Sequence, residues 1–199
     1  MVPSPANLKA AREDLARREE VLRDRLADAD FLANRGLGNE VGIYLFCYDP
    51  SVELELRETV ARLRRDSETG VLPGEVRECN LYDLALECCE QEGVLHDFPV
   101  LEAEEGTAAL LEEFGCIITA ETIVERLEAK LAGASGALFL TGVGEVYPLV
   151  RAHTVLNLVH SSFPSNPVVM FYPGDFNGHE LKLFSALPSI NYYRAFNIM

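Results

Sequence analysis

Residues Gly136–Phe196 read GALFLTGVGEVYPLVRAHTVLNLVHSSFPSNPVVMFYPGDFNGHELKLFSALPSINYYRAF, and this stretch differs in character from everything before it. It holds 10 of the 17 aromatic residues, and its few charges balance. Two apolar runs, Ala137–Thr141 and Pro167–Tyr172, are bounded by glycine or proline, as buried strands are. The sequence between them, Pro148–Ser162, is expected to be a helix. The stretch therefore predicts a strand–helix–strand unit.

The preceding residues extend this pattern. Further strands are predicted over Val41–Cys47 and Val76–Leu81. Helices are predicted over Ser4–Asp28, Val52–Asp66, Tyr82–Glu92, Ala108–Phe114 and Ala120–Leu131. Strands that alternate with helices imply parallel pairing with right-handed crossovers.

The last strands are expected to differ, because Glu180–Phe184 and Tyr192–Ile198 follow each other without an intervening helix. They predict an antiparallel hairpin on the sheet's edge. The fold class expected is thus α/β: a single three-layer domain over residues 1–199 with a mainly parallel sheet. Residues 1–35 form an N-terminal amphipathic helical segment that packs on the domain or extends from it.

The net charge of −15 is unevenly placed. No Lys or Arg occurs between Arg77 and Arg126, whereas acidic residues recur throughout residues 78–125. Such a surface repels phosphate backbones, because duplex binding depends largely on Lys and Arg releasing counterions. Direct nucleic-acid binding through this face is not expected. The acidic stretch is either a solvated surface that favours solubility or a docking face for a basic partner.

The apolar windows, the first residues and the cysteine count predict the compartment of the protein and the redox state of its thiols. No window of about 18 apolar residues predicts a membrane span, and the first residues lack the basic and apolar regions of a signal peptide. The five cysteines, Cys47, Cys79, Cys88, Cys89 and Cys116, are an odd number. We therefore expect reduced thiols in the cytoplasm.

Common catalytic motifs find no match in the sequence. A P-loop needs lysine after a glycine-rich turn, but Lys9, Lys130 and Lys182 follow no such pattern. Gly142-Val-Gly144 follows a predicted strand, yet Tyr147 stands where a dinucleotide fingerprint needs glycine. No G-x-S-x-G elbow occurs. His153 and His160 share a helical face, but two ligands do not make a metal site. We expect no cofactor and no metal.

The ends of the predicted strands hold the remaining candidates. Asp49, Glu145, Arg151, His153 and Asp175 could converge there, either as an acid–base site or as a fixed salt-bridge network. The loops expected around Tyr172 and Tyr193 are rich in Tyr and Arg, which protein interfaces favour. The predicted partner or ligand contacts are Tyr172, Pro173, Gly174, Asp175, Phe176, Tyr192, Tyr193, Arg194, Arg151, His153, Glu145 and Asp49.

Three segments of the last third carry a family resemblance: LFLTGVGEVYPLVRAHTVLN (138–157), PVVMFYPGDFNGHELKLF (167–184) and NYYRAF (191–196). They resemble the BrxB family of bacterial BREX (bacteriophage exclusion) systems, and YLFCYDP (44–50), LEAEEG (101–106) and the length support this. The resemblance implies a small cytoplasmic component of a phage-defence operon. Its neighbours there are a AAA+ ATPase, an adenine methyltransferase and a PglZ-type protein. The resemblance implies no catalytic residues for this chain.

The function expected from these observations is a non-enzymatic assembly or adaptor component of a BREX phage-defence and DNA-methylation complex. It would contact another BREX protein, the PglZ-type protein first and the AAA+ ATPase second, and homo-oligomers are a further possibility. One alternative is a degenerate nucleotide- or small-ligand-binding regulatory domain. Another is a metal-dependent hydrolase that uses Asp49, Glu145 and Asp175.

Overall fold

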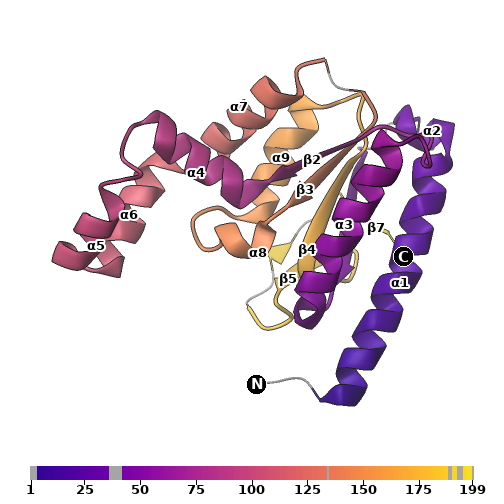
Figure 1. Ribbon diagram of the computed structural model, residues 1–199, viewed down its shortest axis with the longest axis horizontal. Coiled ribbons are helices and arrows are strands. Elements are labelled where there is room, and N and C mark those ends of the chain that lie inside the picture. Colours follow the sequence, from indigo (N-terminus) through magenta and orange to yellow (C-terminus); the bar gives the residue numbers. More distant parts are fainter. Residues whose placement is uncertain (1–3, 36–41, 134, 188–189, 192–194, 199) are drawn as a thin grey trace.

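A computed structural model describes residues 4–35, 42–133, 135–187, 190–191 and 195–198 of the chain. Its main sheet has the strand order β2-β3-β4-β1-β7, and each neighbouring pair is parallel (Figure 1). The bounds are β1 Ile43–Tyr48, β2 Val76–Asn80, β3 Ala137–Thr141, β4 Val168–Phe176 and β7 Phe196–Asn197. The predicted α/β class with a mainly parallel sheet is confirmed.

Strands β1, β3 and β4 form the centre of the sheet. Every residue of β3 is buried, and β4 is buried from Val168 to Gly174. This explains their continuous apolar runs, since helices cover both faces of a parallel sheet. In register, Ile43 lies opposite Val168 and Tyr48 opposite Pro173.

One face of the sheet is covered by α1 (Pro5–Ala27) and α3 (Glu53–Glu68) (Figure 1). The short helix α2 (Ala29–Leu32) follows α1, and the short helix η1 (Pro50–Val52) precedes α3. Ser4 caps α1 by accepting the amide of Asn7, and Leu15, Leu22 and Leu26 are buried. The N-terminal helix therefore packs along the sheet layer, because its apolar stripe is in the same core cluster as Phe46, Phe139 and Phe171.

An ionic network joins α1 to α3. Glu19 Oε2 accepts from Arg62 Nη2 at 2.6 Å, and Glu19 Oε1 accepts from Arg23 Nε at 3.1 Å. Burial alone would raise the pKa of Glu19, but the hydrogen bonds from Arg62 and Arg23 outweigh it and the pKa is lowered. The network fixes the position of α1 through charge as well as apolar contact.

The opposite face carries α4 (Leu81–Gln91), α7 (Ala120–Leu131), α8 (Val143–Val146) and α9 (Ala152–Ser162). The predicted helix over Ala120–Leu131 has the same bounds as α7 and begins with a capping box of Thr119 and Thr122. Two more helices, α5 (Phe98–Glu105) and α6 (Thr107–Ile117), stand away from the sheet beyond α4 (Figure 1). The sequence predicted α6 as Ala108–Phe114 and did not predict α5.

Strand β4 is longer than predicted, and this corrects one expectation. The segment Tyr172–Phe176 was expected to be a loop, but it continues β4. Pro173 has no amide to donate, yet its carbonyl accepts from the Phe184 amide at 2.7 Å. Beyond that point β4 pairs antiparallel with β5 (Glu180–Leu183). Proline is tolerated at position 173 because β4 changes its partner there, from β1 to β5, so the missing amide interrupts no continuous ladder.

The C-terminal hairpin also has a different form. β5 is antiparallel to β6 (Ile190–Asn191), but Phe196–Asn197 joins the main sheet as β7, parallel to β1. Of the strand expected over Tyr192–Ile198, the structure shows β7, which pairs with β1, and the antiparallel partner of β5 is instead the preceding β6. Tyr192–Arg194 lie outside the described residues. A carbonyl of this terminus, that of Ile198, accepts from Arg18 Nη1 at 3.0 Å.

The helix predicted from Pro148 begins instead at Ala152, after α8. Tyr147 ends α8 in an extended conformation with ψ 137°, as expected for a residue before proline. Arg151 is also extended and occupies the N-cap of α9. Between the two helices Val150 is buried and Arg151 is exposed.

Among the described residues, none of the helices has the length and apolar character that crossing a bilayer requires.

The cysteine thiols are free; Cys116 is exposed and the other four are buried. Burial raises the pKa of the Cys47 thiol to about 12, so this group stays protonated and unreactive at neutral pH.

Candidate functional site

The carboxyl edge of the sheet has a recess on each face. Ligands of open α/β sheets bind at this edge, because successive strands deliver loop residues there. The larger recess, the α3-side cavity, has a volume of about 240 Å³. Tyr48 ends β1, Asn80 ends β2 and Thr141 ends β3, so three strands contribute to it.

Arg57 organises the α3-side cavity. Its Nη2 donates to Glu145 Oε1 at 2.8 Å, and its Nε donates to Glu53 Oε1 at 3.0 Å. The Tyr48 hydroxyl donates to the other oxygen of Glu53. Asn80 Nδ2 donates to Glu145 Oε2 at 3.2 Å. One guanidinium therefore bridges two carboxylates that come from α3 and α8.

These contacts determine the protonation states. Burial, followed by the hydrogen bond to Glu53, raises the pKa of Tyr48. The hydrogen bond to Glu53 is the main reason that the pKa of Arg57 is raised. Tyr48 is therefore a neutral hydrogen-bond donor and Arg57 a permanent cation.

A third carboxylate, Glu78, lines the same cavity. It accepts from the Thr141 hydroxyl at 3.0 Å and from Arg64 Nη1 at 3.2 Å. Carboxylates outnumber the cations of the lining, so the cavity disfavours phosphate. It favours a ligand rich in donors or positively charged.

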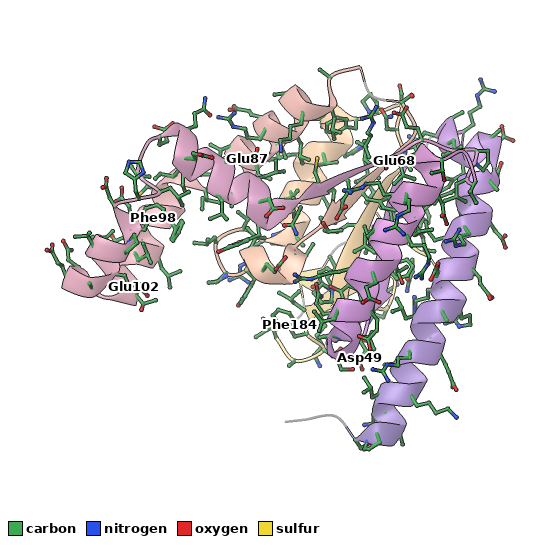
Figure 2. All side chains as sticks on the ribbon, in the orientation of Figure 1. Asp49, Glu68, Glu87, Phe98, Glu102 and Phe184 are labelled. Carbon is green, nitrogen blue, oxygen red and sulfur yellow. The ribbon has the colours of Figure 1, made fainter. Side chains whose placement is uncertain are left out.

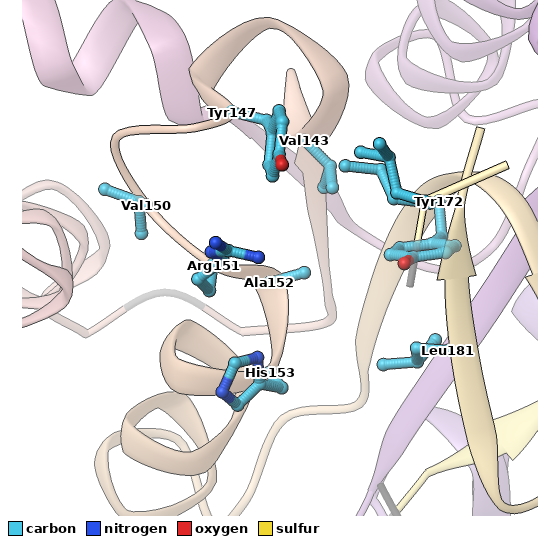
Figure 3. A pocket seen from close by; sticks show the side chains of 10 residues that line it. Val143, Tyr147, Val150, Arg151, Ala152, His153, Tyr172 and Leu181 are labelled. Atoms are coloured by element: carbon cyan, nitrogen blue, oxygen red, sulfur yellow. The ribbon is translucent and has the colours of Figure 1, made fainter. Parts of the chain in front are cut away.

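The second recess, the α9-side recess, is formed by α8, α9, β4 and β5 (Figure 3). Tyr147, Arg151 and His153 lie on one side, and Tyr172 and Leu181 on the other. Its volume is about 30 Å³, which is room for about one or two water molecules. The recess is therefore too small for a metabolite, and what matters is the surface around it.

That surface is aromatic and cationic. The Arg151 guanidinium lies 5.2 Å from the centre of the Tyr147 ring, within cation–π range. Phe184 meets the same ring edge-on, with centroids 6.4 Å apart. Burial, and then the charge of Arg151, lower the pKa of His153, so this imidazole is neutral at pH 7. Arg151 supplies the positive charge of the surface.

The structure separates the five residues of the predicted acid–base group. Asp49 accepts the Ser51 amide at 2.8 Å and caps η1. Glu145 is bound to Arg57, while Arg151 and His153 line the α9-side recess. Asp175 is exposed on β4. In the part of the chain that the structure describes, no three His, Cys, Asp or Glu side chains gather as metal ligands.

The other predicted contact residues are mostly buried. Tyr172 and Phe176 point into the core, and Pro173 and Gly174 are buried beside them. Only Asp175 of this segment is exposed, and both Tyr172 and Phe176 belong to one hydrophobic core cluster. The positions Tyr192, Tyr193 and Arg194 lie outside the described residues.

Sequence reasoning missed Glu53, Arg57 and Asn80. A signal for two of them was present, since Glu53 and Arg57 are spaced i, i+4 on a predicted helix. Asn80 lies near the end of the strand predicted over Val76–Leu81, and it accepts the amides of Tyr82 and Asp83 as the N-cap of α4. The spacing could not indicate that Glu145 would accept hydrogen bonds from both Arg57 and Asn80.

These features define a class: an α/β protein with a mainly parallel sheet and polar residues gathered at the strand ends. Comparison with known proteins shows which family of this class the chain belongs to. The model of the family described as "BREX protein BrxB" matches residues 77–198, and the chain belongs to this BrxB family, which is part of BREX phage-defence systems. The resemblance inferred from the sequence is confirmed.

Two curated relatives carry that same description. The protein from Bacillus cereus (strain H3081.97) is 36% identical over 191 residues, covering 92% of this chain and 96% of its own. The protein from Escherichia coli O9:H4 (strain HS) is 28% identical over 179 residues, covering 89% of this chain and 88% of its own. No solved structure matches.

Proposed function

We propose that the chain is a non-enzymatic assembly component of a BREX complex. As one domain, it contacts another BREX protein through the surface around the α9-side recess. The PglZ-type protein is the first expected partner and the AAA+ ATPase the second. The observation that carries this proposal is the group of exposed Arg151 and Phe184 around the half-buried Tyr147.

Phe184 is the clearest sign of a contact surface. Its side chain is 38% exposed, and both Phe184 and Ser185 have positive φ, 55° and 54°. This conformation costs a non-glycine residue free energy, and such strain concentrates at functional sites. Figure 2 places Phe184 at the end of the molecule that also bears Asp49.

The chemistry of the group supports binding rather than catalysis. Tyr and Arg are the residues that dominate binding energy at interfaces, and Arg151 is exposed beside Tyr147. In the neighbouring cavity, Glu53 and Glu145 already accept hydrogen bonds from Arg57. Both carboxylates thus serve an ion-pair network within the chain.

Partner capture tests this proposal. The tagged protein is co-expressed with its BREX neighbours, and the co-purifying proteins are quantified by mass spectrometry after a salt wash. We expect a stoichiometric partner with the native chain. Combining Arg151→Glu with Phe184→Ala should reduce its recovery by about tenfold or more, because truncation of interface anchors typically costs about 2 kcal/mol or more each.

Leu54→Ala is the matched control, since Leu54 is exposed on the opposite helical layer. It should retain full recovery, and all variants should unfold at similar urea concentrations. Unchanged recovery with the folded double variant would refute this contact surface. Recovery of the native chain alone would refute the assembly role itself.

The second candidate is a small-ligand-binding regulatory domain, and the α3-side cavity favours it. Three carboxylates line the cavity, so the ligand would be a primary amine or a guanidinium compound rather than a nucleotide. Such a ligand stabilises the folded state by mass action.

Agmatine and ATP, each added at saturating concentration, distinguish the possible ligands by thermal unfolding. We expect agmatine to raise Tm and ATP to leave it unchanged. Glu145→Gln should abolish the agmatine shift, and Glu58→Gln, an exposed position on the same helical layer, should retain it. No shift with agmatine would remove this ligand class.

A further inference from the structure

Helices α5 and α6 form a projecting unit, the acidic arm (residues 98–117), on the far side of α4 from the sheet (Figure 1). It contains no Lys or Arg. Its acidic side chains, all of them exposed, are Glu102, Glu104, Glu105, Glu112 and Glu113. Figure 2 shows Glu102 and Phe98 on this unit, remote from Phe184 and Asp49. The arm is thus separate from the surface proposed above.

The charges of the arm are not neutralised within the chain. Across the described residues, no ion pair involves an acid of the arm, and the Glu102 carboxylate accepts from the Thr107 hydroxyl at 3.1 Å. The layer formed by α1 and α3 is different. Asp14, Glu19 and Glu53 each pair with an arginine there. These acids of the α1–α3 layer are thus neutralised by ion pairs within the chain, and the acids of the arm are not.

The position of the acids makes them costly. Glu102, Glu104 and Glu105 occupy the C-terminal half of α5, and its first turn has no acid. Carboxylates near a helix C-terminus oppose the helix dipole. Like charges three residues apart, such as Glu102 and Glu105, also repel. A cationic partner would reverse both effects.

The arm also exposes apolar side chains. Its inner face is fixed by Phe98 and Phe114, whose rings lie 4.4 Å apart, and Phe98 is buried. Val100 and Leu111 are 57% and 42% exposed. No residue of α6 is fully buried. Packing of the arm therefore does not account for Val100 and Leu111.

We propose that the acidic arm docks a basic, amphipathic helix of a partner protein. Lysine and arginine of that helix meet the five glutamates, and its apolar residues cover Val100 and Leu111. Helices of this kind are recognised through apolar anchors on one face, while charge complementarity sets register and association rate. Nucleic acid and anionic lipid carry the wrong charge for this surface.

The test uses the full chain and a fluorescent helical peptide that carries lysine on one face and leucine on the other. A scrambled peptide of the same composition keeps the charge but has no apolar face. Fluorescence anisotropy measures both affinities. We expect the amphipathic peptide to bind the native chain about tenfold more tightly than the scrambled one.

Two quadruple variants locate the binding. The arm variant carries Glu104→Gln, Glu105→Gln, Glu112→Gln and Glu113→Gln. The matched variant removes the same charge from exposed, unbridged acids elsewhere, through Glu20→Gln, Asp24→Asn, Glu58→Gln and Glu128→Gln. The arm variant should lose about tenfold in affinity, and the matched variant less than about twofold, because screening confines the effect to nearby charges.

The apolar contribution is tested separately. Val100→Ser with Leu111→Ser should weaken the amphipathic peptide several-fold, and Leu54→Ser with Val71→Ser should not, although all four side chains are exposed. Equal losses in both quadruple variants would reduce the effect to net charge and overturn the proposal. Absence of peptide binding to the native chain, or equal binding of the scrambled peptide, would overturn it as well.

Discussion

Replacing Phe171 by alanine should lower the free energy of unfolding by about 3–5 kcal/mol. Phe171 lies on the central strand β4 and is 1% exposed. Its ring meets Phe46 of β1 and Phe139 of β3, each at a centroid distance of 5.0 Å. Alanine would leave a cavity that the neighbouring strands cannot fill, because the ladders on both sides fix their spacing.

Urea denaturation measures this change. Phe171→Leu keeps most of the volume and should cost no more than about 1.5 kcal/mol. Leu54→Ala, at a position 73% exposed, should change the free energy of unfolding by about 0.5 kcal/mol or less. If Phe171→Ala were as mild as the Leu54 variant, the three rings would not form the centre of this core. A changed m-value would instead indicate an altered unfolded state.

The central strands β3 and β4, which carry Phe139 and Phe171, could be predicted from the sequence. Residues 137–140 and 168–172 are apolar at every position, as expected of strands that helices cover on both faces. The helix Ala120–Leu131 was equally clear, because Thr119 supplies its cap. Local chemistry determined these elements, so the sequence alone revealed them.

Elements that depend on distant residues were predicted less well. Pro173-Gly174 is typical of a turn, but β4 continues through it because β5 supplies an antiparallel partner. Glu180–Phe184 and Tyr192–Ile198 are predicted to pair with each other, whereas β5 pairs with β6 and β7 pairs with β1. Such pairings are set by tertiary contacts that no local pattern encodes.

The candidate site shows the same limit. Parallel strands end at one edge of the sheet, so polar residues at their ends are expected to lie near one another. The structure nevertheless does not bring Asp49, Glu145 and Asp175 into one group. Which of them would pair depended on α3, whose Arg57 reaches Glu145 across 88 positions of sequence. The acidic arm is the opposite case: its composition was evident from the sequence, but its projection from the sheet was not.

Gly142→Ala should lower the free energy of unfolding by about 2–3 kcal/mol, as the sum of two costs. Gly142 has φ 75°, a left-handed conformation that alanine adopts only with strain. A Cβ there would also lie 2.1 Å from Asn80 Oδ1. Asn80 would have to move, and its cap on α4 and its bond to Glu145 would be lost together.

Gly70→Ala separates these two costs. Gly70 has nearly the same φ, 74°, but a Cβ there meets nothing within 4 Å, so this variant reports the backbone strain alone, about 1 kcal/mol. The excess of Gly142→Ala over Gly70→Ala is then the cost of displacing Asn80. In an Asn80→Ala background that excess should largely disappear, because interacting positions are not additive. Equal losses at the two glycines, or an excess that persists without Asn80, would contradict the arrangement of the α3-side cavity described above.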